Sequence, residues 1–288
     1  MLIEAPNNPT LNLISRSNEA LSIARRVSRA LLEELAIYPK PGLVSHVDSG
    51  SHPDMDAACF EDSIECLEPF FAAMAEAGAD ACPLRVLQQI GIASEQAMLE
   101  ATRGRNTHRG AIFCLGLLAA AAGRRGSGGF SSSISLGEIV RSSWGAELLL
   151  PNELPAMSDG IAMCHRHNIS GVRGEAKSGF PSVYLIGLPA LRRTLSFTSS
   201  SAAKVQVFFE LLAACEDTTL LKRGGAEGRR FAREEAGRFL GNGGVRQQGW
   251  EAEAIGIHRA FVARNLTAGG VADILASTIF IHELEDSL

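Results

Sequence analysis

Two cationic side chains, His108 and Arg109, stand directly before a long apolar run at 111–122. We expect this run to form a helix whose start is capped by Asn106 or Thr107. A helix N-terminus carries partial positive charge, so cations placed there cost stability, about 0.3–1 kcal/mol each. A bound anion reverses this penalty, because backbone N–H groups and both cations then face one negative group. The segment therefore predicts an anion site, for which a polyphosphate is the natural ligand.

A second group of candidates lies in the segment 39–56. Lys40 stands between two prolines, which fix the backbone on either side and so hold one cation in place. Farther along, Asp54 and Asp56 offer two close carboxylates, the ligand type that Mg²⁺ requires. The alternative is a structural role, in which Asp54 or Asp56 caps a helix that starts at Ala57.

The segment 171–181 alternates glycine with Arg173, Glu175 and Lys177. Glycine lets a backbone approach a ligand closely, and here one carboxylate lies between two cations. Glu175 is therefore a candidate general base or metal ligand. The alternative is an ordinary surface loop held by salt bridges.

Two further segments combine glycine with charged residues. In the first, Asp217 is followed by Lys222, Arg223 and two glycines, so that the acid suits a metal and the cations suit a phosphate. The plainer alternative is a helix terminus with a glycine stop. In the second, Gly269 and Gly270 open an almost wholly apolar helix, and an acid in its first turn also fits the helix dipole.

Helices must position these segments, because apolar residues recur at helical spacing through most of the chain and strand-type alternation is scarce. We predict an all-α fold, a single multi-helix globular domain of about ten to twelve helices in which glycine-rich loops form the active site. The domain covers residues 1–288, with 1–18 as a loose N-terminal extension. The predicted breaks between helices lie at 39–56, 102–110, 123–135, 168–181, 222–228, 241–249 and 265–270.

Composition excludes several classes of protein. Hydrophobic residues make up 46% of the 288, enough for a sizeable core, while the net charge of −5 argues against general nucleic-acid binding. The six cysteines form no C-x-x-C pair, as expected of free thiols in a reducing cytoplasm. The longest apolar run, at 111–122, is too short to span a bilayer. We therefore expect a cytoplasmic protein with no membrane partner, and a homo-oligomer is compatible with the sequence.

The common nucleotide-binding motifs, G-x-x-x-x-G-K-[ST] and a strand-linked G-x-G-x-x-G, are absent from the sequence. Taken in order, however, five segments resemble the ATP:dephospho-CoA triphosphoribosyltransferases, also called triphosphoribosyl-dephospho-CoA synthases. Two departures from the family pattern are Val271, where a hydroxyl residue is usual, and Arg105, where a small apolar residue is common. The matching segments are KPGLVSHVDSGSHPDMD (40–56), NTHRGAIF (106–113), RGEAKSGFP (173–181), DTTLLKRGG (217–225) and GGVADILAST (269–278).

The resemblance implies a reaction at C1 of the ribose of ATP. The 2′-hydroxyl of 3′-dephospho-CoA attacks this carbon, adenine leaves, and 2′-(5″-triphosphoribosyl)-3′-dephospho-CoA forms. Mg²⁺ is the expected metal. The product would pass to a holo-carrier-protein synthase and become the prosthetic group of malonate decarboxylase or citrate lyase.

Under this resemblance, the candidate residues take three roles. The catalytic candidates are Glu175, Asp217 and His108, with Glu175 as general base. The metal candidates are Asp54, Asp56 and Asp217. The candidates for binding ATP, mainly through its phosphates, are Lys40, Asn106, Thr107, Arg109, Arg173, Lys177, Lys222, Arg223, Gly269 and Gly270, and His108 is a further phosphate candidate.

Two alternatives remain open. If water replaces the 2′-hydroxyl, the same site would make a metal-dependent N-ribosyl hydrolase. The other alternative is a non-catalytic protein that binds CoA-like metabolites or a carrier protein, although several carboxylates among the basic loops argue against a pure anion binder.

Overall fold

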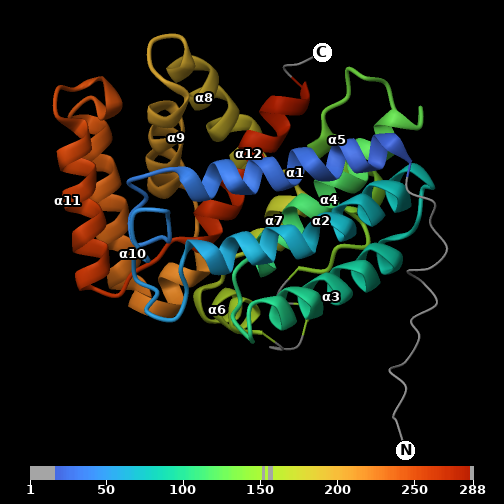
Figure 1. Ribbon diagram of the computed structural model, residues 1–288, viewed down its shortest axis with the longest axis horizontal. Helices are drawn as coiled ribbons and strands as arrows, with labels where there is room; N and C mark the ends of the chain where they lie inside the picture. The colour runs from blue at the N-terminus through green and yellow to red at the C-terminus, as the bar shows by residue number, and fades with distance from the viewer. Residues whose placement is uncertain (1–16, 151–152, 155–157, 286–288) are drawn as a thin grey trace, which may run out of the picture.

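The computed structural model describes residues 17–150, 153–154 and 158–285. In these residues the regular structure consists of twelve α-helices with short π- and 3₁₀-helical turns, and no β-strand occurs there (Figure 1). The predicted all-α fold is thereby confirmed. The helices are α1 (Asn18–Ala36), α2 (Ala57–Ala79), α3 (Leu84–Ala101), α4 (Arg109–Gly126), α5 (Leu136–Trp144), α6 (Asp159–His167), α7 (Gly171–Lys177), α8 (Leu188–Leu195), α9 (Ser200–Ala214), α10 (Thr218–Gly241), α11 (Trp250–Ala263) and α12 (Gly269–Glu285).

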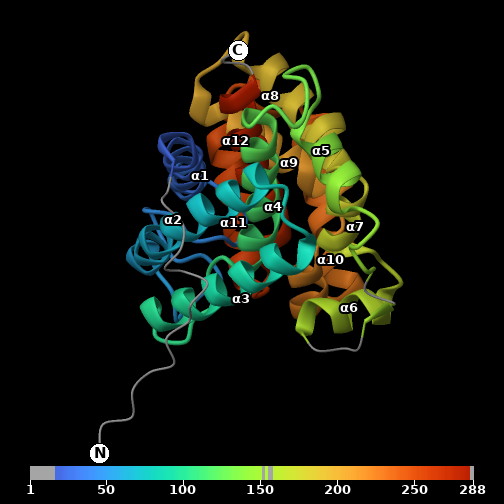
Figure 2. The ribbon, with the colours of Figure 1, turned by 90° about the vertical axis from the view of Figure 1, so that its right-hand side faces the viewer.

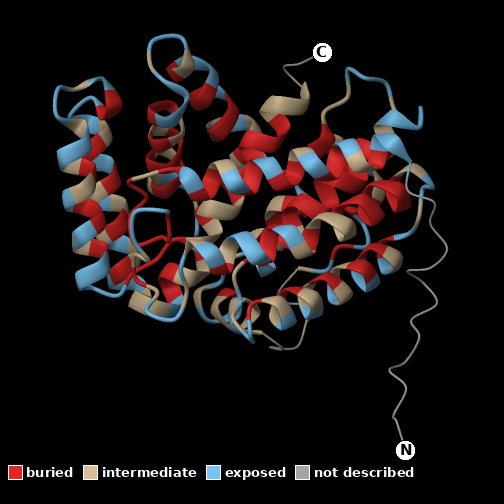
Figure 3. Ribbon diagram, viewed as in Figure 1, coloured by how far each residue is buried: buried red, intermediate tan, exposed pale blue. Residues whose placement is uncertain are grey.

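The helix α4 forms the centre of the hydrophobic core. Almost all of its side chains between Ala111 and Gly123 are buried, as Figure 3 shows. Small residues let α2 pack closely against it, because a Cβ at Gly78 would overlap the backbone of Ala120, and one at Gly123 would overlap that of Ala75. Helices α1, α3, α5 and α12 also pack on α4. The N-terminal end of α4 is therefore held on a rigid support.

Helices α8 to α11 pack beside this centre, at the left of Figure 1. In α9, Phe208 and Phe209 are fully buried, and Phe209 stacks on Phe239 of α10 with ring centroids 4.0 Å apart. Helix α12 contacts α1 and α4 as well as α9, and Figure 2 shows it between them. The buried apolar residues form one continuous core, which confirms the predicted single domain.

Side-chain caps explain where many helices begin. Each capping oxygen accepts a hydrogen bond from a backbone N–H of the first turn, which is worth about 1 kcal/mol. The role of Asp56 agrees with the structural alternative considered for the acids near Ala57. The capping residues are Ser17 (α1), Asp56 (α2), Ser135 (α5), Ser158 (α6), Ser199 (α9) and Asp217 (α10).

Two predicted loops contain helix. The segment 168–181 includes α7, and 222–228 lies inside α10, where the helix is interrupted only at Gly225 (φ 57°, ψ −155°). Glycine lowers helix propensity by about 1 kcal/mol per residue, but packing of α7 against α4, α5 and α6 outweighs that cost. The prediction of loops at these positions was therefore wrong.

Of the predicted extension 1–18, residues 1–16 lie outside the described residues, whereas Ser17 caps α1 and Asn18 begins it. Among the described residues, no helix combines the length and apolar character needed to cross a membrane.

Candidate active site

The N-terminal ends of α4, α10 and α12 meet at one place. Asp217, the cap of α10, accepts a hydrogen bond from the backbone N–H of Val271 in α12 (2.9 Å). At α4, a Cβ on Gly110 would overlap the carboxylate of Asp273, so glycine leaves the room that this α12 side chain occupies. Three helix ends with partial positive charge therefore lie close together, and the carboxylates of Asp217 and Asp273 accept hydrogen bonds from their backbone N–H groups.

The loop between α1 and α2 joins this region. Ser51 donates a hydrogen bond to the carbonyl of Leu266, just before α12 (2.7 Å), and Arg223 of α10 donates to the carbonyl of Ser51 (2.6 Å). His52 lies between Arg223 (3.1 Å) and the Thr267 hydroxyl (3.0 Å). Burial, followed by the Arg223 charge, lowers the pKa of His52 to about 4, so the ring is neutral.

Asp217 is bonded at both carboxylate oxygens. Its Oδ1 accepts from the backbone N–H groups of Thr219 and Leu220 (both 2.8 Å) and from the Thr219 hydroxyl (2.5 Å), while Oδ2 accepts from Val271. Burial is the largest effect and raises the pKa of Asp217, although these hydrogen bonds favour the ionised form. The carboxylate thus joins two helices, and each of its oxygens already accepts at least one hydrogen bond from the protein.

The two glycines at the start of α12 permit this arrangement. The Gly269 backbone N–H donates to the Thr219 hydroxyl (2.8 Å), and a Cβ on Gly270 would lie 3.1 Å from Asp217 Oδ2. Both residues are partly exposed, so the helix end beside them is open to a ligand.

His108 precedes the first turn of α4 and is only 4% exposed. Its Nδ1 lies 2.7 Å from the Ser63 hydroxyl, to which the Thr107 hydroxyl donates (2.8 Å). Its Nε2 is buried and has no hydrogen-bond partner among the described residues. Burial, followed by the charge of Lys40, lowers the pKa of His108 to about 3. The ring is neutral at pH 7, so the prediction of a second cation at this helix end was wrong.

Lys40 lies in the interior and is 1% exposed. Its ammonium group donates to the carboxylate and to the backbone carbonyl of Glu34, both at 2.5 Å, in the last turn of α1. Burial lowers the pKa of Lys40, and the negative charge of Glu34 opposes that shift. A cation at a helix C-terminus is favourable, so in this structure Lys40 serves α1 rather than an open phosphate site.

Asp273 completes a group of buried charges. The residue retains some exposure, but protein atoms surround its carboxyl group. Burial raises its pKa well above the ordinary value, the charges of Asp217 and Glu34 raise it further, and a hydrogen bond from the Ala111 backbone N–H opposes them. Asp273 is therefore the carboxyl group of this cluster best suited to hold a proton.

Exposed cations surround the buried group. Arg109 pairs with Glu95, and Lys222 pairs with Asp159 (2.5 Å) on α6, with side chains 45% and 56% exposed. Asn106 accepts a hydrogen bond from the Arg109 backbone N–H (3.1 Å), which supports the predicted cap. Exposed ion pairs contribute about 0–1 kcal/mol, so a phosphate can replace these partners at little cost.

Helix α7 carries three candidates with different surroundings. The Arg173 guanidinium lies over the Phe113 ring of α4, 5.4 Å from its centroid. Glu175 accepts hydrogen bonds from the Ser182 backbone N–H (3.1 Å) and hydroxyl (2.7 Å). Lys177 donates to the carbonyl of Leu148 (2.8 Å). Glu175 and Lys177 thus already hold neighbouring segments, whereas Arg173 faces the start of α4.

The predicted metal ligands divide into exposed and buried residues. Asp54 and Asp56 are exposed, although Asp56 Oδ1 caps α2 (3.0 Å to the Cys59 N–H), while Asp217 is buried and fully bonded. Within the described ranges, no group of three or more His, Cys, Asp or Glu residues is arranged to hold a metal ion. Mg²⁺ is commonly held by one or two carboxylates plus substrate phosphates and water, so the exposed Asp54 and Asp56 suit it better than the buried Asp217.

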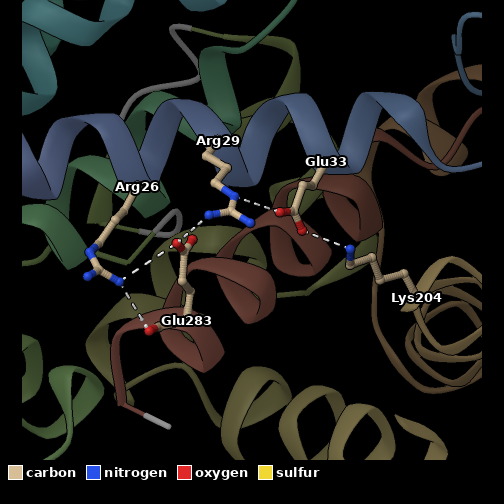
Figure 4. Close-up of polar contacts among 5 residues, drawn as sticks. All are labelled: Arg26, Arg29, Glu33, Lys204 and Glu283. Carbon is tan, nitrogen blue, oxygen red and sulfur yellow. Dashed lines mark hydrogen bonds and ion pairs between the residues drawn. The ribbon is translucent and has the colours of Figure 1, made fainter. Parts of the chain in front are cut away.

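A cavity of about 410 Å³ lies apart from these residues, between α1, α8, α9 and α12. Its charged groups pair with one another, as Figure 4 shows. Glu33 accepts from Arg29 (3.0 Å) and Lys204 (2.8 Å), and Glu283 pairs with Arg29 (3.2 Å) and Arg26 (3.7 Å). None of the predicted site residues lines this cavity, so we locate the candidate site at the three helix ends.

Sequence reasoning missed several partners in the site. Glu34 and Ser63 both lie on apolar helix faces, beside Leu35 and Ile64, and a polar residue on such a face is a signal that could have been used. His258 gave no such signal in the sequence. Its ring lies 2.9 Å from the Lys40 carbonyl oxygen and 3.1 Å from Asp48 Oδ1, and it fixes the loop after α1.

The fold thus brings residues of α4, α10 and α12 together at three adjoining helix ends, with the exposed cations Arg109 and Lys222 nearby. The family model for ATP:dephospho-CoA triphosphoribosyl transferase matches residues 20–288. Proteins named 2-(5″-triphosphoribosyl)-3′-dephosphocoenzyme-A synthase are similar to the chain. The one from Pectobacterium atrosepticum is 39% identical over 274 residues (91% of this chain, 89% of the relative), and that of Klebsiella pneumoniae is 40% identical over 276 residues (91% and 90%). No solved structure matches the chain significantly. The chain belongs to the ATP:dephospho-CoA triphosphoribosyl transferase family and is a transferase.

Proposed function

We propose that this enzyme transfers the 5-triphosphoribosyl group of ATP to the 2′-hydroxyl of 3′-dephospho-CoA. The observation that carries the proposal is the meeting of three helix N-termini with the cations Arg109, Lys222 and Arg223. A triphosphate bears about four negative charges and is bound well by helix ends and charge-assisted hydrogen bonds. The named relatives support the same substrates.

The reaction requires two proton transfers at the ribose. The C1–N bond to adenine breaks, the C1–O bond to the 2′-hydroxyl forms, the hydroxyl loses a proton and the departing adenine gains one. An oxocarbenium-like charge develops on the sugar, as in glycoside hydrolysis, and nearby carboxylates stabilise it. Asp273 suits the proton donor, because burial and the neighbouring acids raise its pKa well above the ordinary value, whereas several hydrogen bonds oppose the rise in the pKa of Asp217. Glu175 remains the proposed base, and its bonds to Ser182 would have to open for that role.

Mg²⁺ belongs to the proposal as the partner of the triphosphate. Asp54 and Asp56 would hold it together with phosphate oxygens, and its chemistry there is neutralisation of phosphate charge. Asp217 is less suited to this role, since it is buried and both of its oxygens already accept hydrogen bonds.

We further propose that the enzyme acts in the cytoplasm and passes its product to a holo-carrier-protein synthase, for malonate decarboxylase or citrate lyase. No membrane or nucleic-acid partner is required.

Mass spectrometry of the product from ATP and dephospho-CoA tests the proposal, with adenine release measured in parallel. The expected result is one equivalent of adenine per triphosphoribosyl-dephospho-CoA, dependent on both substrates. Adenine released at the same rate without dephospho-CoA would point to the N-ribosyl hydrolase instead. Tight binding of dephospho-CoA without any release of adenine would indicate a non-catalytic binding protein.

The Glu175→Gln variant tests the proposed base separately. It should bind ATP almost as the wild type does but lose most adenine release, because the amide cannot accept the hydroxyl proton. Turnover at the wild-type rate would remove Glu175 from the mechanism.

A further inference from the structure

The unpartnered nitrogen of His108 is the least explained polar atom of the site. A buried donor without an acceptor is costly, about 1–3 kcal/mol, and such groups are rare in folded proteins. His108 Nε2 is buried and makes no hydrogen bond within the described part of the chain. The chain beside the ring reaches the surface, because Thr107 is partly exposed and the Arg109 side chain is 45% exposed. An acceptor atom of a ligand would satisfy this nitrogen.

The hydrogen bonds around the ring are compatible with a proton on Nε2. Thr107 donates its hydroxyl hydrogen to Ser63 Oγ (2.8 Å), so the hydrogen of Ser63 is free to point at His108 Nδ1 (2.7 Å). Nδ1 then accepts, and in a neutral ring the proton resides on Nε2. The unpartnered atom is therefore an N–H donor.

We propose that His108 donates a hydrogen bond from its neutral Nε2–H to an oxygen of the bound nucleoside triphosphate, and that Ser63 and Thr107 are positioning residues that fix this tautomer. The choice of ligand rests on the proposed function. The low pKa of His108 agrees with an uncharged ring. It argues against two other roles for His108, namely a positively charged side chain that binds phosphate and an acid that protonates adenine. A donor of this kind requires no proton transfer, so an uncharged side chain with an N–H at the same point should replace it.

Variants at position 108 distinguish a donor from an acid. The side-chain amide of His108→Gln places an N–H close to the position of Nε2 but cannot transfer a proton. We expect H108Q to keep ATP affinity and adenine release within about 10-fold of wild type, whereas H108A loses about 10- to 100-fold in one or both. An H108Q variant as impaired as H108A, or an H108A variant equal to wild type, would overturn the donor role.

The tautomer is measured without any substrate. In ¹⁵N-histidine-labelled full-length protein, the His108 signals, identified by their loss in H108Q, should show a protonated Nε2 and a bare Nδ1 from pH 5 to 8. In Ser63→Ala, the two tautomers should both be populated and ATP affinity should fall. Ser63→Thr keeps a hydroxyl and should retain the wild-type tautomer and ATP affinity. Thr107→Val should have the same effects as Ser63→Ala but smaller ones. Thermal unfolding of each variant separates these effects from loss of the fold.

These measurements separate failure of the inference from failure of the proposed function. A proton on Nδ1, or an imidazolium at pH 7, contradicts the inference whatever reaction the enzyme catalyses. The predicted tautomer with no response of the Nε2 signal to saturating ATP also contradicts it. The predicted tautomer, an ATP-induced shift and no adenine release by the wild type would overturn the proposed transfer reaction but leave the donor in place.

Discussion

Replacing Asp217 by alanine should destabilise the protein far more than removal of an ordinary helix cap. The carboxylate receives four hydrogen bonds, from two backbone N–H groups and one hydroxyl at the start of α10 and from one N–H of α12. Two caps at about 1 kcal/mol each, plus the cost of leaving buried donors unpaired, give a loss of about 3–5 kcal/mol. For a chain of this size we expect the melting temperature to fall by about 6–20 °C.

Asp56→Ala is the matched control, because Asp56 is an exposed cap with a single hydrogen bond to the start of α2. It should cost about 1 kcal/mol, or about 2–4 °C. Thermal unfolding of both variants is compared with and without Mg²⁺. An Asp217→Ala loss no larger than that of Asp56→Ala would refute the reasoning. A loss seen only when Mg²⁺ is present would restore the metal-binding role predicted from sequence.

Three further predictions concern the same region. Gly110→Ala should lower the stability measured by thermal unfolding by about 1–3 kcal/mol and reduce adenine release, because its Cβ would overlap the Asp273 carboxylate. In the control Gly237→Ala, where nothing lies within 4 Å, stability should rise by up to about 1 kcal/mol. Equal effects of the two variants would contradict the close approach of Asp273 to Gly110. The folded-state pKa of His108 is about 3 and its ordinary value is 6.5, so the unfolded chain takes up the proton first as pH falls. The free energy of unfolding should therefore decrease below about pH 6.5, by up to about 1.4 kcal/mol per pH unit. Urea unfolding at several pH values should show a weaker dependence on pH for H108Q than for the wild type. Lys40→Met should cost about 3–5 kcal/mol in urea unfolding because it strands the buried carboxylate of its glutamate partner, and replacing that partner by leucine as well should recover most of the loss.

The helical fold and the segments of the site could be predicted because they depend on local pattern. Apolar spacing marks α1, α2, α9 and α12 in the sequence. Gly110 and the pair Gly269–Gly270 stand out because they lie at the start of apolar helices, and Gly110 follows Arg109 directly. Glycine at these points allows close approach between segments, as the overlap expected at Gly110 illustrates.

The partners of charged side chains could not be predicted, because they depend on which segments meet in space. Lys40 looks like an exposed cation in a proline-rich loop, yet it is buried against Glu34. His108 looks like a cation at a helix end, yet burial makes it neutral. Asp217 looks like a metal ligand, yet its partners include Val271, which is 54 residues away in the chain. Sequence pattern thus locates ionisable residues, but it gives neither their partners nor their charge states.

The loop after α1 is tied to the far end of the chain, and this has a consequence for folding. His258 contacts the Lys40 carbonyl across 218 residues, and Ser51 contacts Leu266 across 215. Closing such long loops costs entropy before any contact is gained, and contacts distant in sequence slow folding. The candidate site should therefore be among the last parts of the molecule to assemble. Since a ligand stabilises only the state that binds it, ATP would select fully folded molecules and protect them from unfolding.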